Sequence, residues 1–127
     1  MSVSSREAWV RNFFRIVDTI NPDEIVAHVT EDVRLQFANQ KPIVGREAIR
    51  QALAETYSSI QRDVHNIIEI WQKEDSVAVE IEVVYTRLDG KQVTTPTVTI
   101  LRLEGNLIKD YRIFQDNSPV YAADPLS

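Results

Sequence analysis

The 127-residue chain carries 14 lysine and arginine residues against 19 aspartate and glutamate residues, a net charge of −5 at pH 7. Proteins that bind nucleic acid cluster basic residues against phosphates, so this scattered basic minority predicts no nucleic-acid partner. The absence of cysteine excludes disulfides, a thiol nucleophile and a thiolate metal site.

Length and hydropathy narrow the class of protein further. A content of 43% hydrophobic and 26% charged residues is typical of a soluble globular protein. We expect a single domain over 1–127, with its core over about 6–121 and a flexible tail over 122–127. No apolar run approaches the ~20 residues of a membrane span, and the first residues lack the apolar part of a signal peptide. The expected location is therefore the cytoplasm, without a membrane partner.

Three helices are predicted in the first half of the chain. Ser4 and Glu7 have the spacing of a capping box, ahead of apolar residues that recur at helical spacing over 9–20. Asn21 caps a second helix that begins with a proline. A third helix follows Gly45.

Strands are predicted over most of the remaining chain, where apolar and polar residues alternate between turns that contain glycine. A short strand precedes the third helix, and four more follow it. Helices followed by strands that are joined by tight turns indicate an α+β domain with an antiparallel sheet. The predicted strands are 33–37, 64–71, 76–87, 92–103 and 107–116.

The last predicted strand has an unusual face. Asp110, Arg112, Phe114 and Asp116 alternate with the residues of the other face, so they lie on one side together with Ile108. Two carboxylates, a guanidinium and an aromatic ring make a poor core, and they are typical of a polar group inside an apolar pocket. This face predicts a pocket, without fixing a reaction.

Several short motifs occur in an order that covers roughly residues 9–121. They are Glu31-Asp32-Val33, Gly45-Arg46-Glu47-Ala48-Ile49, Tyr85-Thr86-Arg87-Leu88-Asp89-Gly90, Pro96, and Asp110-Tyr111-Arg112-Ile113-Phe114-Gln115-Asp116 with Pro119. With these motifs the chain resembles the SnoaL-like branch of the nuclear transport factor 2-like superfamily, whose members include ketosteroid isomerase, limonene epoxide hydrolase and SnoaL polyketide cyclase. The resemblance implies a cone-shaped, curved antiparallel sheet wrapped by three N-terminal helices around a pocket. Because this fold hosts enzymes, binding modules and scaffolds, it does not imply one activity.

The resemblance also implies where catalytic residues would lie. The tyrosine and two aspartates of ketosteroid isomerase align with Phe13, Phe37 and Val98, so chemistry by that mechanism is not expected. The Arg-x-Asp pair and the late aspartate of limonene epoxide hydrolase align with Glu80-x-Glu82 and Arg112. The chain thus has Glu80 in place of the hydrolase's arginine and Arg112 in place of its late aspartate, so the positions of the positive and negative charges are exchanged. The aspartate base of the SnoaL cyclases is approximated by Asp116 or Asp110.

Each of these residues also has a structural alternative. Periodicity alone favours Glu80 and Glu82 on a solvent or dimer face, whereas the resemblance places them in the pocket. Arg112 is either a surface partner of nearby carboxylates or a clamp for a ligand oxyanion. As a clamp it is expected to point into the cavity within ion-pair reach of Glu80 or Glu82, because a buried guanidinium needs a paired carboxylate. Asp116 precedes a proline turn, which favours a turn-forming role. His65 is a candidate for the pocket mouth, and two isolated histidines do not predict a metal site.

The sequence therefore predicts a protein that binds a small hydrophobic molecule. It is either a cyclase, isomerase or hydrolase without a cofactor, or a non-catalytic binding or dimerisation module. A homodimer is expected through the outer face of the sheet, where Val93, Thr95, Thr97, Thr99 and Leu101 are placed. The proposed catalytic residues are Arg112, Glu80, Glu82, Asp116 and Asp110, and the proposed ligand-binding residues are Phe13, Phe37, Tyr57, Val84, Val98, Phe114 and Trp9.

Overall fold

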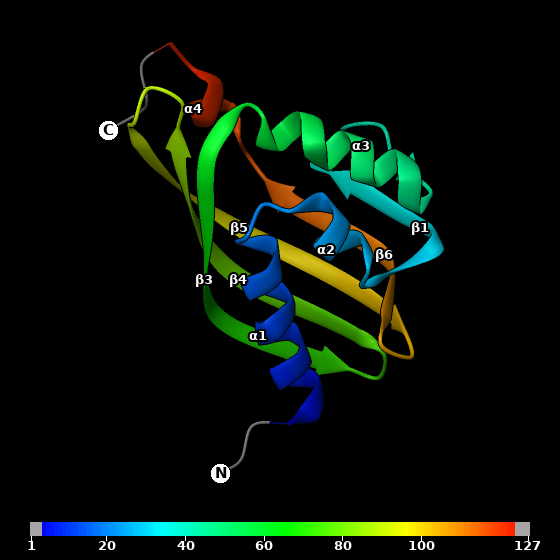
Figure 1. Ribbon diagram of the computed structural model, residues 1–127. Helices are drawn as coiled ribbons and strands as arrows, with labels where there is room; N and C mark the ends of the chain where they lie inside the picture. Colours follow the sequence, from blue (N-terminus) through cyan, green and yellow to red (C-terminus); the bar gives the residue numbers. More distant parts are fainter. Residues whose placement is uncertain (1–3, 124–127) are drawn as a thin grey trace.

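The computed structural model describes residues 4–123 and shows a curved sheet with helices on its concave side (Figure 1). The six strands lie in the order β2-β1-β6-β5-β4-β3. In chain order the elements are α1 (Ser5–Val17), α2 (Pro22–Val26), β1 (Val29–Phe37), β2 (Ile43–Val44), α3 (Arg46–Tyr57), β3 (Ile60–Lys73), β4 (Ser76–Arg87), β5 (Gln92–Glu104), β6 (Leu107–Gln115) and α4 (Ser118–Tyr121).

The helices begin where the capping residues predict. The Ser4 hydroxyl accepts a hydrogen bond from the Glu7 backbone N–H, and the Asn21 side chain accepts one from Asp23. These bonds satisfy N–H groups that have no partner inside the helix. The apolar side of α1 is then buried, with Phe13 fully inaccessible to solvent.

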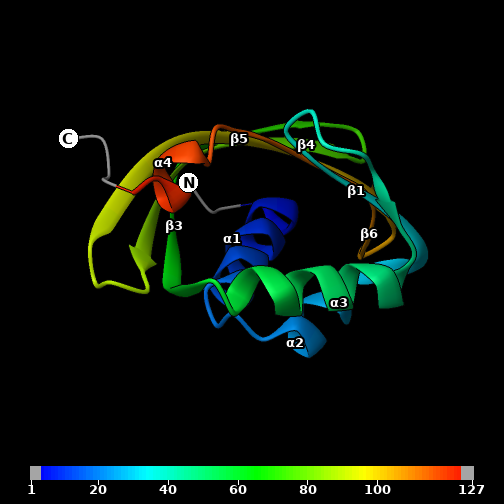
Figure 2. The same cartoon turned by 90° about the horizontal axis from the view of Figure 1, so that it is seen from above.

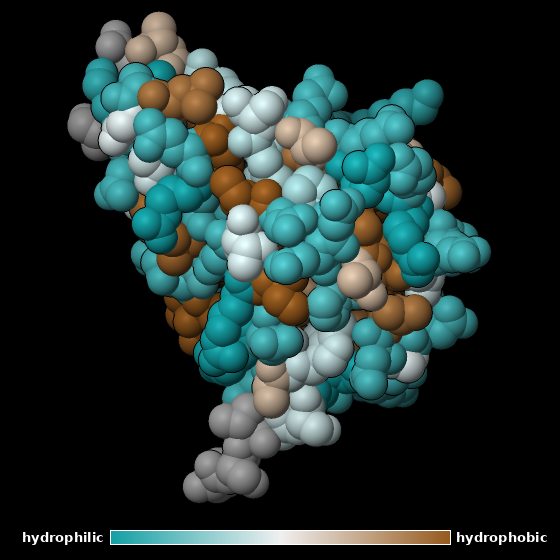
Figure 3. All heavy atoms as spheres, viewed as in Figure 1, coloured by the Kyte–Doolittle hydropathy of each residue, from teal (hydrophilic) through white to brown (hydrophobic). Residues whose placement is uncertain are grey.

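The sheet bends into an arch, and α1 crosses the space beneath it while α3 closes the opposite side (Figure 2). This arrangement confirms the predicted α+β cone. The face seen in the view of Figure 1 is mostly hydrophilic, with hydrophobic residues in scattered patches (Figure 3). No helix within residues 4–123 is long and apolar enough to cross a membrane.

The sheet is mixed, which corrects the prediction of a purely antiparallel one. β1 pairs with β6 in parallel, and every other neighbouring pair is antiparallel. β3, β4, β5 and β6 follow one another through tight turns, which force adjacent strands to reverse direction. The chain from β1 to β6 instead passes through β2, α3, β3, β4 and β5, so no turn imposes an antiparallel pairing.

Some boundaries also differ from the prediction. β1 begins at Val29, whereas the predicted strand began at residue 33. The prediction started too late because the exposed polar residues Glu31 and Asp32 interrupt the alternation near the start of the strand. β2 and α4 were not predicted, and they have only 2 and 4 residues. The predicted flexible tail lies mostly outside the described residues, since 124–127 are not described.

The two faces of the sheet differ sharply in burial. On β5 the concave face carries Val93, Thr95, Thr97, Thr99 and Leu101, which are all buried. These residues were predicted on the outer face, so that prediction is wrong. Their alternation was recognised correctly, but a strand with threonines on one side and mixed residues on the other does not reveal which side faces the core.

Candidate functional site

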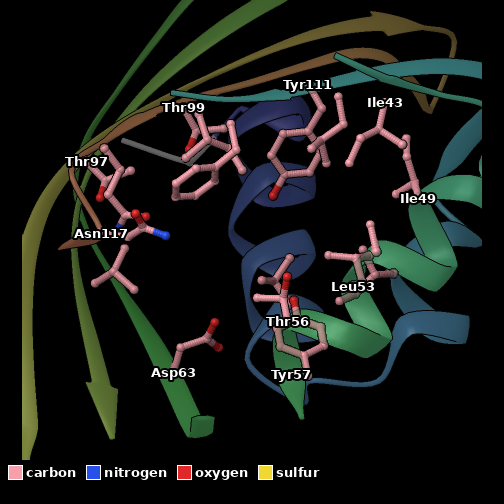
Figure 4. Close-up of a pocket in the computed structure, with 18 of the residues that line it drawn as sticks. Ile43, Ile49, Leu53, Thr56, Tyr57, Asp63, Thr97, Thr99, Tyr111 and Asn117 are labelled. Atoms are coloured by element: carbon pink, nitrogen blue, oxygen red, sulfur yellow. The ribbon is translucent and has the colours of Figure 1, made fainter. Parts of the chain in front are cut away.

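A cavity of about 310 Å³ lies between the concave face of the sheet and the helices (Figure 4). One wall is apolar, with residues of α1, α2, β1 and α3 such as Val17, Ile25 and Leu53. The opposite wall is polar, since β3, β5 and β6 contribute side chains that can form hydrogen bonds. These polar residues include Asp63, His65, Thr97, Thr99, Tyr111 and Gln115.

The carboxyl group of Asp63 is the most unusual group in this wall. It comes from β3, has only 4% of its surface exposed, and points into the cavity (Figure 4). Its Oδ1 atom has no hydrogen-bond partner. Burial raises the pKa of Asp63 from 3.8 to about 6, the charge of His65 opposes this rise, and the charge of Asp18 adds to it. A carboxyl group with this pKa can both donate and accept a proton near neutrality.

Asp18 and His65 lie beside Asp63. Asp18 ends α1, and its Oδ1 atom lies 2.7 Å from Nδ1 of His65 and 3.0 Å from the backbone nitrogen of the same residue. His65 also packs against the ring of Phe14, with 5.3 Å between the ring centres. One carboxylate oxygen each of Asp18 and Asp63 and one ring nitrogen of His65 lie within 4.8 Å of one another.

Three tyrosines of the cavity wall, of which Tyr111 is buried and Tyr57 and Tyr85 are half-buried, contribute hydroxyl groups that stay protonated. Burial raises the pKa of Tyr57, Tyr85 and Tyr111 well above the ordinary tyrosine value. The Tyr85 hydroxyl donates a hydrogen bond of 3.0 Å to Oε1 of Gln115. Gln115 in turn donates through Nε2 to the hydroxyl of Thr95, which fixes its amide orientation. The cavity therefore offers neutral hydrogen-bonding groups in addition to Asp63.

The aromatic residues predicted to bind ligand divide into two groups. Phe37 and Tyr57 line the cavity. Trp9 and Phe13 instead pack in the adjoining core, stacked with 5.5 Å between their ring centres, and Phe13 contacts the ring of Tyr111. Ligand binding by Phe37 and Tyr57 stays a prediction, whereas Trp9 and Phe13 support the cavity wall from behind.

The remaining predicted site residues do not line the cavity. Strand pairing joins Glu80, Val98 and Phe114 in one row across β4, β5 and β6, and Arg112 pairs with Ile100 in the next row. Directly paired residues share a face, and the neighbours Val83, Thr97, Thr99, Ile113 and Gln115 line the cavity from the other face. Glu80, Glu82, Val84, Val98, Asp110, Arg112 and Phe114 therefore lie on the convex face.

A break in alternation explains the error on β6. Ile108 pairs with Leu103, while Asp110 pairs with the preceding residue Arg102, so Lys109 is an extra residue in the β6 strand. Such a bulge shifts the following residues to the opposite face. Ile108 is buried as expected, but its burial no longer implies that Arg112 faces inward. Within residues 4–123, no ion pair joins Arg112 to Glu80 or Glu82.

The two late aspartates have structural partners. Asp110 pairs with Arg34 at 3.6 Å and with Arg102 at 3.1 Å, which ties β6 to its neighbours on both sides. Asp116 accepts a hydrogen bond from the Ser118 backbone N–H, and this bond holds the pKa of Asp116 below its ordinary value. The turn-forming role of Asp116 therefore fits the geometry. A catalytic role for Asp110 or Asp116 stays a prediction, and neither residue lines the cavity.

Sequence reasoning missed Asp18 and Asp63. The second predicted strand began at residue 64, so Asp63 appeared to lie in the preceding loop. In the structure β3 begins at Ile60, and the i, i+2 spacing of Asp63 and His65 places both side chains on the cavity wall. That spacing was the available signal for Asp63. Asp18 gave no signal, because its contact with β3 is made only by the fold.

These features define a cone-shaped α+β fold with an internal pocket. A family model for the SnoaL-like domain matches residues 10–111 of the chain. The chain therefore belongs to the SnoaL-like domain family.

Several solved structures share this fold. They include a hypothetical protein with a ketosteroid isomerase-like fold from Catenulispora acidiphila DSM 44928 in complex with trimethylamine, at 20% identity and a TM-score of 0.76, covering 84% of this chain and 83% of the other. A putative SnoaL-like polyketide cyclase from Jannaschia sp. CCS1 matches at 17% identity and a TM-score of 0.76. The match covers 100% of this chain and 99% of the other.

A third similar structure is the epoxide hydrolase/cyclase-like enzyme SalBIII, which has a role in pyran ring formation in the polyether salinomycin. It matches at 22% identity and a TM-score of 0.77, covering 87% of this chain and 90% of the other. At these identities the comparisons show a common fold. No curated protein matches the chain.

Proposed function

We propose that the protein binds a small hydrophobic molecule in the central cavity and catalyses a proton transfer on it, as a cyclase, isomerase or hydrolase without a cofactor. The observation that carries this proposal is the Asp63 carboxyl group, which is buried in the cavity wall with an unpartnered oxygen and a pKa of about 6. A buried carboxyl tuned toward neutrality is a functional-site feature, because structural carboxylates are normally paired or solvated. The cyclase and epoxide hydrolase/cyclase-like names of the similar structures support the same class.

The cavity fits a hydrophobic guest. Its volume of about 310 Å³ is within the usual range for small-molecule sites, and its wall combines apolar side chains with a few polar groups. Burying apolar surface would supply most of the binding free energy, and the hydroxyl and carboxyl groups would orient the guest.

Binding can be tested with N-phenyl-1-naphthylamine, an uncharged fluorophore whose emission rises in apolar surroundings. Ala52 lines the cavity, whereas Ala54 is exposed on the same helix. We expect Ala52→Trp to fill the cavity and abolish the fluorescence increase, while the matched Ala54→Trp variant binds as the wild type does. Equal binding by both variants would place the fluorophore elsewhere.

Catalysis can be tested with three groups of compounds: unsaturated ketones, aromatic polyketide esters and hydrophobic epoxides. We expect the wild type to convert at least one group, and Asp63→Asn to lose that activity while still binding the fluorophore. Asp32→Asn, an exposed aspartate on β1, is the matched control. Tight binding without conversion would favour the alternative of a non-catalytic module. Phe37 supports this alternative, because it lines the cavity at a position where the resemblance places a catalytic aspartate.

We further propose a homodimer through the convex face of the sheet. Trp71, Val98 and Phe114 are 50%, 38% and 43% exposed there. They lie on β3, β5 and β6, and β4 lies between β3 and β5 in the sheet. Exposed aromatic and aliphatic side chains on one continuous face are typical of an interface between protein chains. The cytoplasmic location stays a prediction that rests on composition.

A further inference from the structure

Asp18 and His65 form a hydrogen-bonded pair at the cavity wall, although 47 positions separate them in the chain. One carboxylate oxygen of Asp18 accepts a bond from the His65 backbone N–H at 3.0 Å and lies 2.7 Å from the ring Nδ1. The two contacts together hold β3 against the end of α1 and fix the orientation of the imidazole. The arrangement couples the end of α1 to a side chain that faces the cavity.

The chemistry of Asp18 determines the proton position on His65. An ionised carboxylate only accepts hydrogen bonds, so Nδ1 of a neutral imidazole must carry the proton in this pair. The other ring nitrogen, Nε2, is then unprotonated and can accept a proton. The same pair logic operates in hydrolases whose aspartate orients a histidine base.

Asp63 is the complementary group. It precedes His65 by two residues on β3, is 4% exposed, and has an unpartnered Oδ1 atom at the cavity. Since burial raises its pKa to about 6, a fraction of Asp63 remains protonated close to neutrality. A protonated carboxyl group donates a hydrogen bond and can release its proton to a ligand.

We propose that Asp18, His65 and Asp63 form one proton-transfer unit, in which Asp18 is a positioning residue, His65 accepts a proton through Nε2, and Asp63 donates one, on a ligand without negative charge. This inference rests on the proposed function and assigns the groups that perform it.

The transfer balances in protons and electrons. A C–H or O–H bond of the ligand breaks, its proton goes to His65 Nε2, and its electron pair moves into the ligand. The ligand atom that gains the negative charge takes the proton of Asp63, so the O–H bond of the Asp63 carboxyl group breaks. The ligand becomes an isomer of itself, His65 becomes an imidazolium and Asp63 a carboxylate, until a proton passes from His65 back to Asp63 through solvent.

A second hollow provides the connection to solvent. It has a volume of about 260 Å³, and its wall includes Asp18 and His65 together with Arg11, Phe14 and Arg15 of α1. His65 thus lines both this hollow and the cavity. A proton taken from a ligand on one side can leave from the Asp18–His65 pair on the other.

The lining also selects the charge of the ligand. Among the described residues, the cavity wall contains no lysine or arginine, while it contains Asp63 and adjoins Asp18. A buried anion without a cationic partner is strongly unfavourable, and these carboxylates would repel it. A ligand without negative charge avoids both costs.

The proton position can be measured without any ligand. ¹⁵N NMR at about pH 8.5, two units above the ordinary histidine pKa of about 6.5, reports which ring nitrogen is protonated. We expect Nδ1–H on His65 in the wild type and in the Asp32→Asn control, and a mixture with Nε2–H in Asp18→Asn; His65→Gln identifies the signal. A wild-type His65 protonated on Nε2 would overturn the inference, whatever the ligand tests show.

The charge preference can be measured with two dyes that share one ring system. N-phenyl-1-naphthylamine is uncharged, and 8-anilinonaphthalene-1-sulfonate adds one sulfonate. We expect the uncharged dye to bind the wild type at least about tenfold more tightly, because the sulfonate would be buried beside a carboxylate. Asp63→Asn should narrow this ratio, whereas a purely steric exclusion of the sulfonate would leave it unchanged. Equal affinity of both dyes for the wild type would overturn the charge assignment, and failure of both to bind would instead contradict the proposed function.

Discussion

The guanidinium of Arg112 lies 4.9 Å from the centre of the Phe114 ring, on the convex face of the sheet. This distance is within the range of a cation–π contact. Arg112 is half-buried, and its Nε atom has no hydrogen-bond partner. Its environment is thus an aromatic ring at the surface of the sheet, which differs from the ion pair inside the cavity that the sequence predicted.

Replacing Arg112 with Leu should therefore have a small effect. We expect a loss of about 0.5–1 kcal/mol in the free energy of unfolding, the usual size of an exposed cation–π contact, and no change in the affinity for N-phenyl-1-naphthylamine. Urea unfolding and dye titration measure the two quantities, with Lys109→Leu, an exposed residue of the same strand, as the control. A loss of about 3–5 kcal/mol would instead indicate a buried ion pair that the substitution breaks.

The outcome for Arg112 shows which part of the fold the sequence could predict. Local signals were sufficient for the helix starts at Ser4 and Asn21 and for the β4 strand over 76–87, because caps and turns depend on neighbouring residues. The alternation of β6 was also recognised. Its orientation was not, because a one-residue bulge at Lys109 changes which face points inward and leaves no pattern in the sequence.

The candidate site was harder to predict for a different reason. Asp63 and His65 are close in sequence, but their partner Asp18 is at the end of a helix, 47 positions before His65. Only the packing of α1 beneath the arch brings the three side chains together. For Glu80 and Glu82 the simple alternation was the better guide, since it favoured the outer face on which the structure places them.

The dimer proposal predicts that charge on the convex face separates the subunits. Val98 lies between Glu80 and Phe114 in the strand pairing, and it is 38% exposed. We expect Val98→Asp to convert a wild-type dimer into a monomer in sedimentation velocity, because the new carboxylate would be buried beside Glu80. Leu88→Asp, in an exposed turn, should leave the dimer intact. A wild type that sediments as a monomer at micromolar concentration would refute the proposal.

The hydrogen bond from Tyr85 to Gln115 should contribute measurably to stability. Tyr85→Phe removes the donor and leaves the Gln115 carbonyl oxygen unpaired beside the cavity. We expect a loss of about 1–3 kcal/mol in the free energy of unfolding, the usual cost of a buried polar atom that loses its partner. Tyr121→Phe is the matched control, since its hydroxyl contacts Ser59 at an exposed position. Equal effects of the two substitutions would show that solvent replaces the missing donor in both places.

The raised pKa of Asp63 predicts a specific dependence of stability on pH. The folded-state pKa of about 6 lies above the ordinary value of 3.8, so the folded state binds this proton more tightly than the unfolded state does. Well below pH 3.8 the carboxyl group is protonated in both states, and it carries no ionisation cost. As the pH rises through 6, the folded protein must bury a charge that the unfolded chain exposes to water. This one group should therefore lower the free energy of unfolding by about 2.5 kcal/mol between pH 4 and pH 7.

Comparison with Asp63→Asn isolates this contribution. The amide cannot ionise, so the variant should gain stability relative to the wild type by about 2.5 kcal/mol as the pH is raised from 4 to 7. Urea unfolding at the two pH values measures this difference, and other titrating groups largely cancel because both proteins contain them. Asp32→Asn removes an exposed carboxylate and should show little change of this kind. A difference between wild type and Asp63→Asn that stays constant with pH would mean that Asp63 titrates normally, and the cavity would then lack the proton donor on which the proposed chemistry depends.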